Sequence, residues 1–361
     1  MKNARLPTSL PGQAPDLRFR RKPLPGLILT VLVPVAAILL AWLWLQQGRR
    51  GLVVACTHDA EFAALVFDAF TKKTGIPVTP VYDTEATKSL ALVEQIQREN
   101  GRPRADVLWN NEMLGMLELQ RRGLLAPHAG EGWKRMPAAW RDPDGLWTAF
   151  GARMRGMIVN TTLVSAAEAA RDPLPAGDLS KFTMAKPQFG TTLTHAAALW
   201  QELGADAFKA WWADAQARGL KVVAGNGMTK SLVADGACRA GFTDTDDYAS
   251  AREAGKPVAF VPARLPSGKT IAIPNTVALL RGAKHESDAK VFIDFLLSAD
   301  SEVLLANSAA RQIPLGPVDA AKLPPEVSSW AEAARNSVDL RGLLDARNAC
   351  LEWIRSAGAG K

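Results

Sequence analysis

Polar side chains that could bind a ligand gather where apolar runs give way to helical patterns. Such loops stand at 57–59, 83–87 and 110–112, and again at 188–194, 225–231 and 244–247. Hydroxyls and the backbone N–H groups of helix N-termini suit phosphate, phosphonate or carboxylate ligands. Ordinary helix capping is the alternative explanation, because Thr, Asn and Asp are common caps. The predicted ligand contacts are Thr57, His58, Asp83, Thr84, Glu85, Thr87, Asn111, Thr191, Thr192, Asn226, Thr245 and Asp246.

Covalent catalysis has no comparable support in the sequence. The patterns GxSxG, GxxxxGK[ST], HExxH and a complete GxGxxG are all missing. Cys56, Cys238 and Cys350 are widely spaced and lack a CxxC pair, so they encode no zinc site and at most one disulfide. We therefore predict no catalytic residue and a protein that is not an enzyme.

The elements that must position these loops alternate between strand and helix. Apolar runs at 52–56, 78–82 and 105–109 read as strands, and helical patterns begin at Asp59, Thr84 and Met113. A second unit follows: a helix from His195, strands at 221–224, 240–243 and 269–273, and a helix at 288–297. This order predicts an α/β fold with a parallel sheet. Ligands of such sheets bind beyond the carboxyl ends of the strands, which is where the polar loops fall.

The net charge of +7 belongs to the N-terminal segment. Residues 1–50 hold eight Lys and Arg against Asp16 alone, whereas residues 51–361 hold 35 basic and 35 acidic residues. A neutral globular part has no bulk attraction for a polyanion, so nucleic acid is not a predicted partner.

The same segment predicts a membrane association. Residues 27–45 are nineteen residues without a charge, about the length that crosses ~30 Å of hydrocarbon as a helix. The basic cluster before them puts the N-terminus in the cytoplasm. We expect a cytoplasmic basic tail at 1–23, a transmembrane anchor or signal segment at 24–46, and the remainder on the periplasmic side of the inner membrane. Cleavage, which would release the protein into the periplasm, is the alternative, although 46–50 contain no A-x-A pattern.

Several short motifs occur together in a recognisable order. They are FTKKTGIPV at 70–78, ADVLWNNE at 105–112, FGTT at 189–192, GNGM at 225–228, GFTDTDD at 241–247, IPNTVA at 273–278, VFIDFLLS at 291–298 and QIPL at 312–315. In this order the chain resembles bacterial extracellular solute-binding proteins of ABC transporters, and most of all their ferric-iron-binding branch. The resemblance covers about residues 52–317.

The resemblance implies a two-lobed type II periplasmic-binding-protein fold that closes on its ligand like a flytrap. Lobe one would comprise 51–150 and 270–361, lobe two 151–269, with crossovers near 151–159 and 270–277. The implied function is capture of a small ligand between the lobes and its delivery to an ABC permease in the inner membrane, by a protein expected to be a monomer. An exported hydrolase or a non-transport ligand sensor on the same fold is the alternative function.

The ligand is left open between two classes. Ferric-binding relatives hold iron with two adjacent tyrosinates, a histidine and a glutamate, whereas this chain has only Tyr82 and Tyr248. An oxygen-rich site remains an option because hard cations favour carboxylates. Its predicted metal ligands are His58, Glu85, Asp246 and Asp247. We expect no certain cofactor: ferric iron or another metal would be the transported ligand, and a small anion is the other candidate.

Overall fold

The structure, a computed structural model, describes residues 51–83, 91–169 and 177–358. The predicted anchor at 24–46, the predicted helix start at Thr84 and the predicted ligand contacts Thr84, Glu85 and Thr87 lie outside these residues. Within them, no helix combines the length and the apolar character that a membrane crossing requires.

Lobe one is built on a parallel group of strands beside an antiparallel one. β1 pairs in parallel with both β2 and β3, and β10 runs antiparallel to β3, β4 and β5. These strands are β1 (Leu52–Cys56), β2 (Val78–Tyr82), β3 (Val107–Asn110), β4 (Leu125–Ala126), β10 (Ala272–Leu280) and the first half of β5 (Thr148–Asn160). The helices around them are α2 (Ala60–Thr74), α3 (Ala91–Glu99), α4 (Leu114–Arg121), α5 (Glu131–Arg135), η2 (Ala138–Trp140), α11 (Glu286–Leu296) and α12 (Ala299–Asn307).

Lobe two repeats the strand–helix alternation at the other end of β5. β6 pairs in parallel with β7 and β8, and the second half of β5 runs antiparallel to β8 and β9. Its strands are β6 (Phe182–Ala185), β7 (Lys221–Val223), β8 (Ala240–Asp244) and β9 (Val258–Pro262). Its helices are α6 (Ala166–Ala169), α7 (Gly190–Leu203), α8 (Ala205–Ala217), α9 (Asn226–Ala234) and α10 (Thr245–Glu253).

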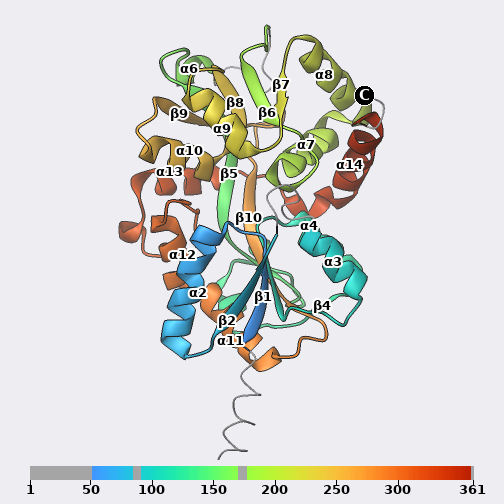
Figure 1. Cartoon of the computed structure of the whole chain (residues 1–361), viewed down its shortest axis with the longest axis vertical. Helices are drawn as coiled ribbons and strands as arrows, with labels where there is room; N and C mark the ends of the chain where they lie inside the picture. The colour runs from blue at the N-terminus through green and yellow to red at the C-terminus, as the bar shows by residue number, and fades with distance from the viewer. Residues whose placement is uncertain (1–50, 84–90, 170–176, 359–361) are drawn as a thin grey trace, which may run out of the picture. The chain divides into compact units, whose positions relative to one another are not determined.

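β5 is the strand that the two lobes share. Residues 148–154 pair with β10, and residues 155–159 pair with β8. In Figure 1 this strand runs from the group of β1 and β2 to the group of β6, β7 and β8. The sheet order β2-β1-β3-β10-β5-β8-β6-β7 therefore passes through both lobes. This is the predicted two-lobed α/β fold, and β5 and β10 lie at the predicted crossovers.

The C-terminal segment contacts both lobes. It consists of η3 (Ala320–Lys322), α13 (Pro325–Ala334), η4 (Leu340–Leu343) and α14 (Leu344–Gly358). α14 packs on α7 of lobe two and on α4 of lobe one, and η4 lies against the same two helices. The predicted lobe boundaries stay a prediction, but residues after 340 do not contact lobe one alone.

Local sequence signals explain most element ends, and the two largest differences from the predicted bounds are at the starts of α7 and β10. The first helix ends as expected at Gly75, whose φ is 73°. α7 begins at Gly190 rather than near the predicted start at His195. Its threonines do not disrupt the first turn because the hydroxyls of Thr191 and Thr192 bond to side chains of other elements. The predicted strand 269–273 is instead β10 from Ala272, since the Thr270 N–H donates to the Asn336 carbonyl, outside the sheet.

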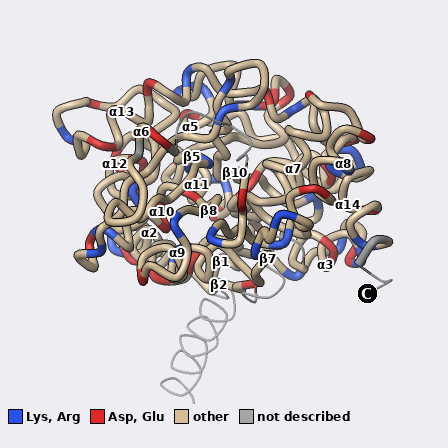
Figure 2. The backbone as a smooth tube through the Cα atoms, turned by 90° about the horizontal axis from the view of Figure 1, so that it is seen from above, with Lys and Arg blue, Asp and Glu red and all other residues tan. Residues whose placement is uncertain are grey.

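Charge and cysteine placement in the described residues follow the composition. Lys and Arg are interspersed with Asp and Glu around the periphery instead of collecting on one side (Figure 2). Cys56, Cys238 and Cys350, all within the described residues, are buried and joined by no disulfide.

Candidate functional site

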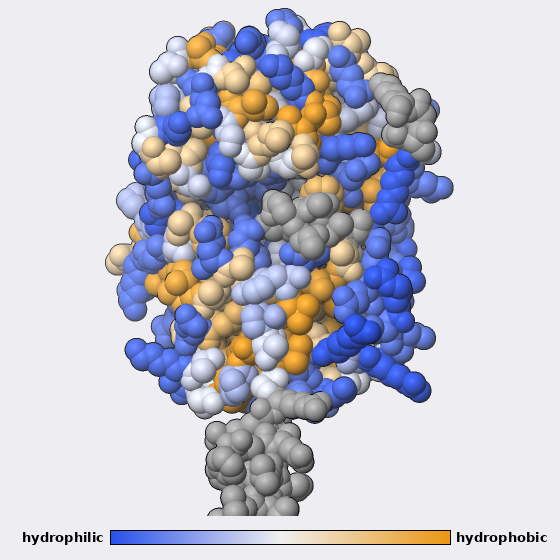
Figure 3. Space-filling view, in the orientation of Figure 1, coloured by the Kyte–Doolittle hydropathy of each residue, from blue (hydrophilic) through white to orange (hydrophobic). Residues whose placement is uncertain are grey.

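A cavity of about 240 Å³ lies between the lobes, at the carboxyl ends of the strands. Lobe one contributes Asp59 after β1 and Asn111 after β3, and Arg153 comes from β5. Lobe two contributes the rest: Ala185, Phe189, Gly190, Thr191, Thr192, Gly225, Asn226, Gly227, Lys230, Asp244, Asp246 and Asp247. Figure 3 shows hydrophilic side chains across the middle of one face, between the two lobes.

Three helices of lobe two begin at this cavity. α7 begins at Gly190, α9 at Asn226 and α10 at Thr245, and among the described residues no N-cap side chain bonds to these first turns. Gly190 has a φ of +56°, and open space lies where a side chain of Gly190, Gly225 or Gly227 would stand. The first N–H groups of a helix lack partners within the helix and carry its positive dipole end. The cavity wall therefore offers backbone donors to an acceptor group.

Asp244 accepts hydrogen bonds from side chains at the first turns of α7 and α9 and from β5. Its Oδ2 accepts from the Thr191 hydroxyl at 2.6 Å and from Asn226 Nδ2 at 3.0 Å, and its Oδ1 accepts from Arg155 Nη1 at 2.9 Å. Asn226 Oδ1 in turn accepts from the Thr192 hydroxyl at 3.0 Å. The predicted contacts Thr191, Thr192 and Asn226 thus come together, but their side chains bond mainly to one another.

Arg155 supplies the positive charge that pairs with Asp244 in this network. The residue is 0% exposed, and its Nε and Nη2 have no hydrogen-bond partner among the described residues. Burial and, to a smaller extent, the charge of Arg155 lower the pKa of His195 to about 3, so this imidazole is neutral. Arg155 and Asp244 form an ion pair removed from solvent.

Arg153 lies two residues before Arg155 and reaches the cavity itself. Its Nη2 donates to the carbonyl of Asn111 in lobe one, and its Nη1 lies 3.7 Å from Asp246 Oδ2 in lobe two. The residue is 3% exposed, and its Nε has no partner in the described part of the chain. Arg153 therefore connects the two lobes across the candidate site.

The carboxylates of α10 are affected by burial. Burial raises the pKa of Asp246 to about 7, against the opposing charge of Arg153. Burial also raises the pKa of Asp247, which accepts from the Thr243 hydroxyl and lies 3.8 Å from Lys230 Nζ. Asp246 therefore carries less than a full negative charge near neutral pH.

Four predicted contacts lie away from the cavity lining. His58 is 2% exposed and packs 5.4 Å from the ring of Trp109. The Thr57 hydroxyl accepts from the Asn111 N–H at 2.7 Å, and the Thr245 hydroxyl accepts from the Met154 N–H at 3.2 Å. Asp83 accepts from the Leu92 N–H near the start of α3 at 3.4 Å. The structure places Thr57 and Thr245 as supports of the backbone, and the ligand role of all four stays a prediction.

Of the predicted metal ligands, Asp246 and Asp247 both line the cavity, whereas His58 lies outside its lining. No group of three or more His, Cys, Asp or Glu side chains there is arranged to hold a metal ion, and Glu85 is not described. Tyr248 packs in the core against Phe260 and Trp330, with ring centroids 5.6 Å and 6.0 Å away. Tyr82 is 36% exposed on β2. A tyrosinate pair is therefore missing from the described part of the cavity.

Sequence reasoning missed the basic residues of the site. Arg153, Arg155 and Lys230 were not among the predicted contacts. A signal for the first two does exist: the arginines alternate within the otherwise apolar run at 147–159, so both side chains fall on one face of a buried strand. Charged residues are rarely fully buried without a partner, and such a pattern indicates a site.

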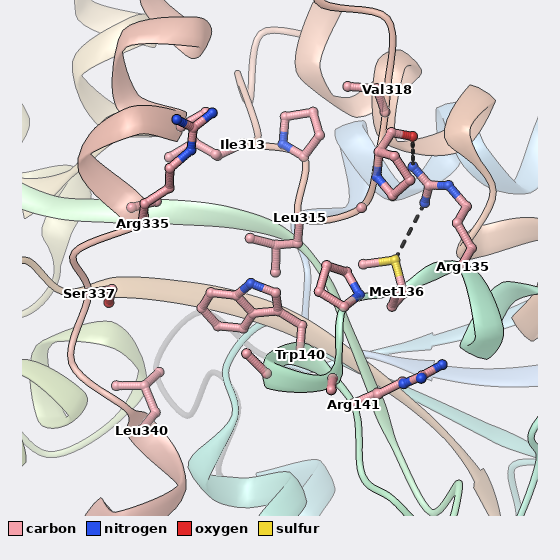
Figure 4. A pocket seen from close by; sticks show the side chains of 18 of the residues that line it. Arg135, Met136, Trp140, Arg141, Ile313, Leu315, Val318, Arg335, Ser337 and Leu340 are labelled. Carbon is pink, nitrogen blue, oxygen red and sulfur yellow. Dashed lines mark hydrogen bonds between the residues drawn. The ribbon is translucent and has the colours of Figure 1, made fainter.

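A second, larger groove of about 990 Å³ lies elsewhere in the same unit. Trp140 and Leu315 occupy its centre in Figure 4, with Arg335 at one side and Arg135 at the other. Arg135 is engaged there, donating to the Pro317 carbonyl at 2.7 Å and pairing with Glu302 at 2.8 Å. The groove is mainly apolar and lacks a buried, unpartnered polar group among its described residues.

Solved structures resemble this fold closely. Iron-bound HitA from Pseudomonas aeruginosa is 23% identical with a TM-score of 0.73, and the match covers 85% of this chain and 99% of HitA. The ferric binding protein from Campylobacter jejuni is 17% identical with a TM-score of 0.71, covering 84% and 99%. AfuA from Actinobacillus pleuropneumoniae, with fructose-6-phosphate bound, is 19% identical with a TM-score of 0.65, covering 84% and 98%. At these identities the likeness shows the two-lobed fold.

The family follows from the sequence match. The model of the family described as bacterial extracellular solute-binding protein matches residues 66–335, most of both lobes. The chain belongs to the family of bacterial extracellular solute-binding proteins.

Proposed function

We propose that the protein captures a small oxyanionic solute, carrying a phosphate, phosphonate or carboxylate group, in the cavity between its lobes and delivers it to an ABC permease. The observation that carries this proposal is the convergence of the uncapped first turns of α7 and α9 with Arg153 on one cavity. Helix N-termini and an arginine together favour an anion.

Asp244, Asp246 and Asp247, three of the four carboxylates that line the cavity, are compatible with this assignment. Asp244 already accepts hydrogen bonds from Arg155, Thr191 and Asn226. Asp247 lies beside Lys230, and the raised pKa of Asp246 leaves part of its population protonated near neutral pH. A protonated carboxyl donates a hydrogen bond, so Asp246 can itself contact an oxyanion.

Titration calorimetry on the full-length protein tests the ligand class with inorganic phosphate, methylphosphonate, citrate and ferric citrate. We expect phosphate or another of the oxyanions to bind without added metal. Arg153→Gln should weaken that binding about tenfold, because it removes a charge-assisted donor. Arg98→Gln, at a side chain that is 70% exposed and remote from the cavity, is the matched control.

If ferric citrate were the only one of these ligands to bind, the oxyanion assignment would be overturned and iron, which is bound in the HitA structure, would be favoured. Equal binding by Arg153→Gln and the wild type would show that the cavity described above is not the site.

We also propose that residues 24–46 anchor the protein in the inner membrane with both lobes outside the cytoplasm. The support is the uncharged run at 27–45 and the basic cluster that precedes it. Carbonate extraction of membranes followed by intact-mass measurement tests this. Retention in the membrane with the N-terminus intact is expected, whereas a soluble chain that starts after residue 46 would contradict it.

A further inference from the structure

We propose that Arg155 and Asp244 are positioning residues that fix the first turns of α7 and α9, so that the ligand is held by backbone N–H groups rather than by the side chains of Thr191 and Asn226. The part of this statement that concerns the ligand rests on the proposed function. The positioning itself is a property of the ligand-free protein.

The side chains of Thr191 and Asn226 already make several hydrogen bonds within the protein. A threonine hydroxyl has one proton, and that of Thr191 points to Asp244 Oδ2 at 2.6 Å. Its oxygen accepts from Asn226 Nδ2 at 3.0 Å. Asn226 Nδ2 also reaches Asp244 Oδ2 at 3.0 Å, and Asn226 Oδ1 accepts from Thr192 and, at 3.3 Å, from Arg155. Little capacity is left on either side chain for a ligand.

Arg155 contacts side chains of three different elements of lobe two. Its Nη1 contacts Asp244, Asn226 and Thr191 at 2.9, 3.3 and 3.4 Å, so one buried guanidinium joins β8, α9 and α7. Arg155 does not line the cavity and is paired with Asp244 in the β5–β8 register. It is therefore placed to act through the residues above it and not by direct contact with a solute.

The backbone at the first turns of α7 and α9 is accessible at the cavity surface. Gly190, Gly225 and Gly227 line the cavity, and nothing lies within 4 Å of the position of an added Cβ. These glycines leave the backbone of both first turns open to a ligand. Two helix N-termini held at a fixed spacing present several N–H donors to one tetrahedral oxyanion.

Hydrogen exchange and calorimetry on three single variants of the full-length protein test the proposal. Thr191→Val removes the hydroxyl that donates to Asp244 but keeps the backbone N–H. Asp244→Asn removes the charge that pairs with Arg155. Thr229→Val is the matched control, because Thr229 in α9 is 0% exposed and its hydroxyl has no hydrogen-bond partner among the described residues.

In the ligand-free protein we expect Thr191→Val and Asp244→Asn to raise amide exchange in peptides 186–199 and 222–233, and Thr229→Val to leave it unchanged. Inorganic phosphate affinity, measured by calorimetry, should fall about tenfold in the first two variants and stay within about twofold in the control. If Asp244→Asn does not fold, the near-isosteric Thr191→Val still decides the question.

Two outcomes would overturn the proposal. If Thr191→Val weakened phosphate binding while exchange in the ligand-free protein stayed at the wild-type rate, the Thr191 hydroxyl would be a direct ligand contact. Unchanged exchange in both variants would show that the network does not position the helices. Failure of the wild type to bind any oxyanion is a different result: it would refute the proposed function, while the exchange data would still report on positioning.

Discussion

Arg153 and Arg155 lie two residues apart on β5, and their guanidinium groups have different surroundings. Arg153 contacts Asn111 of lobe one and Asp246 of lobe two, at the cavity. Arg155 does not line the cavity and forms a buried ion pair with Asp244. Removal of one partner of such a buried pair typically costs about 3–5 kcal/mol, because the other charge is left uncompensated. Asp244→Asn is therefore expected to destabilise the protein more than any change at the exposed residues of lobe two.

The raised pKa of Asp246 predicts a pH dependence of stability. Because its pKa is about 7 in the folded protein and near the usual carboxylate value when unfolded, the folded state binds more protons between about pH 4 and 7. The contribution of Asp246 to the free energy of unfolding is thus fully present below about pH 4 and is lost as the pH rises through 7. Asp246→Asn should flatten this part of the stability profile.

Urea denaturation of the wild type and Asp246→Asn at several pH values between 4 and 8 measures this effect. Asp214→Asn is a suitable control, because the Asp214 side chain is 60% exposed on α8. Parallel profiles for Asp246→Asn and the wild type would contradict the assigned pKa.

Strand-to-helix loops are the elements that make the site, and their positions were predictable from apolar periodicity. Thr191, Thr192, Asn226 and Asp246 lie at one cavity because the parallel strands of lobe two end at a common edge, and Asn111 follows β3 of lobe one on the other side. The sequence could not reveal that Asp244 bonds to both Thr191 and Asn226, since that pairing depends on how β8 lies beside β6. The type of residue alone does not distinguish the buried Arg155 from a surface arginine, whereas its place in an apolar run does.

A pair of glycine substitutions tests the geometry of the two first turns. Gly190→Ala should lower the free energy of unfolding by about 1 kcal/mol, because a φ of +56° is unfavourable for a residue with a Cβ. Gly227→Ala, inside α9 and with equally open surroundings, should raise it by about 0.5–1 kcal/mol through helix propensity. Chemical denaturation of the ligand-free protein provides both values. Equal effects of the two substitutions would contradict the backbone conformation assigned to Gly190.

The two lobes are connected by more than β5 and β10. One continuous apolar cluster contains Leu108 and Leu117 of lobe one, Ala197 and Leu199 of lobe two, and Leu343 of η4. As a member of the extracellular solute-binding family, the protein binds its solute outside the cytoplasm with these lobes. The shared cluster predicts that both lobes unfold in one cooperative transition.

Leu343→Ala tests the role of this cluster. Leu343 is 2% exposed, and loss of a buried leucine side chain typically costs about 2–5 kcal/mol. Leu163→Ala, at a residue that is 54% exposed, should change stability by less than about 0.5 kcal/mol. Differential scanning calorimetry should show one transition for the wild type. Two well-separated transitions would contradict the idea that η4 and α14 unite the lobes.

We expect an oxyanion to bind at the first turns of α7 and α9. Crystals of the protein soaked with tungstate, a tetrahedral oxyanion with a strong anomalous signal, test it most directly. We expect an anomalous peak within hydrogen-bonding distance of the backbone nitrogens of 190–192 and 226–228 and beside Arg153. A peak only in the groove around Trp140 and Arg335, or no peak between the lobes, would contradict it.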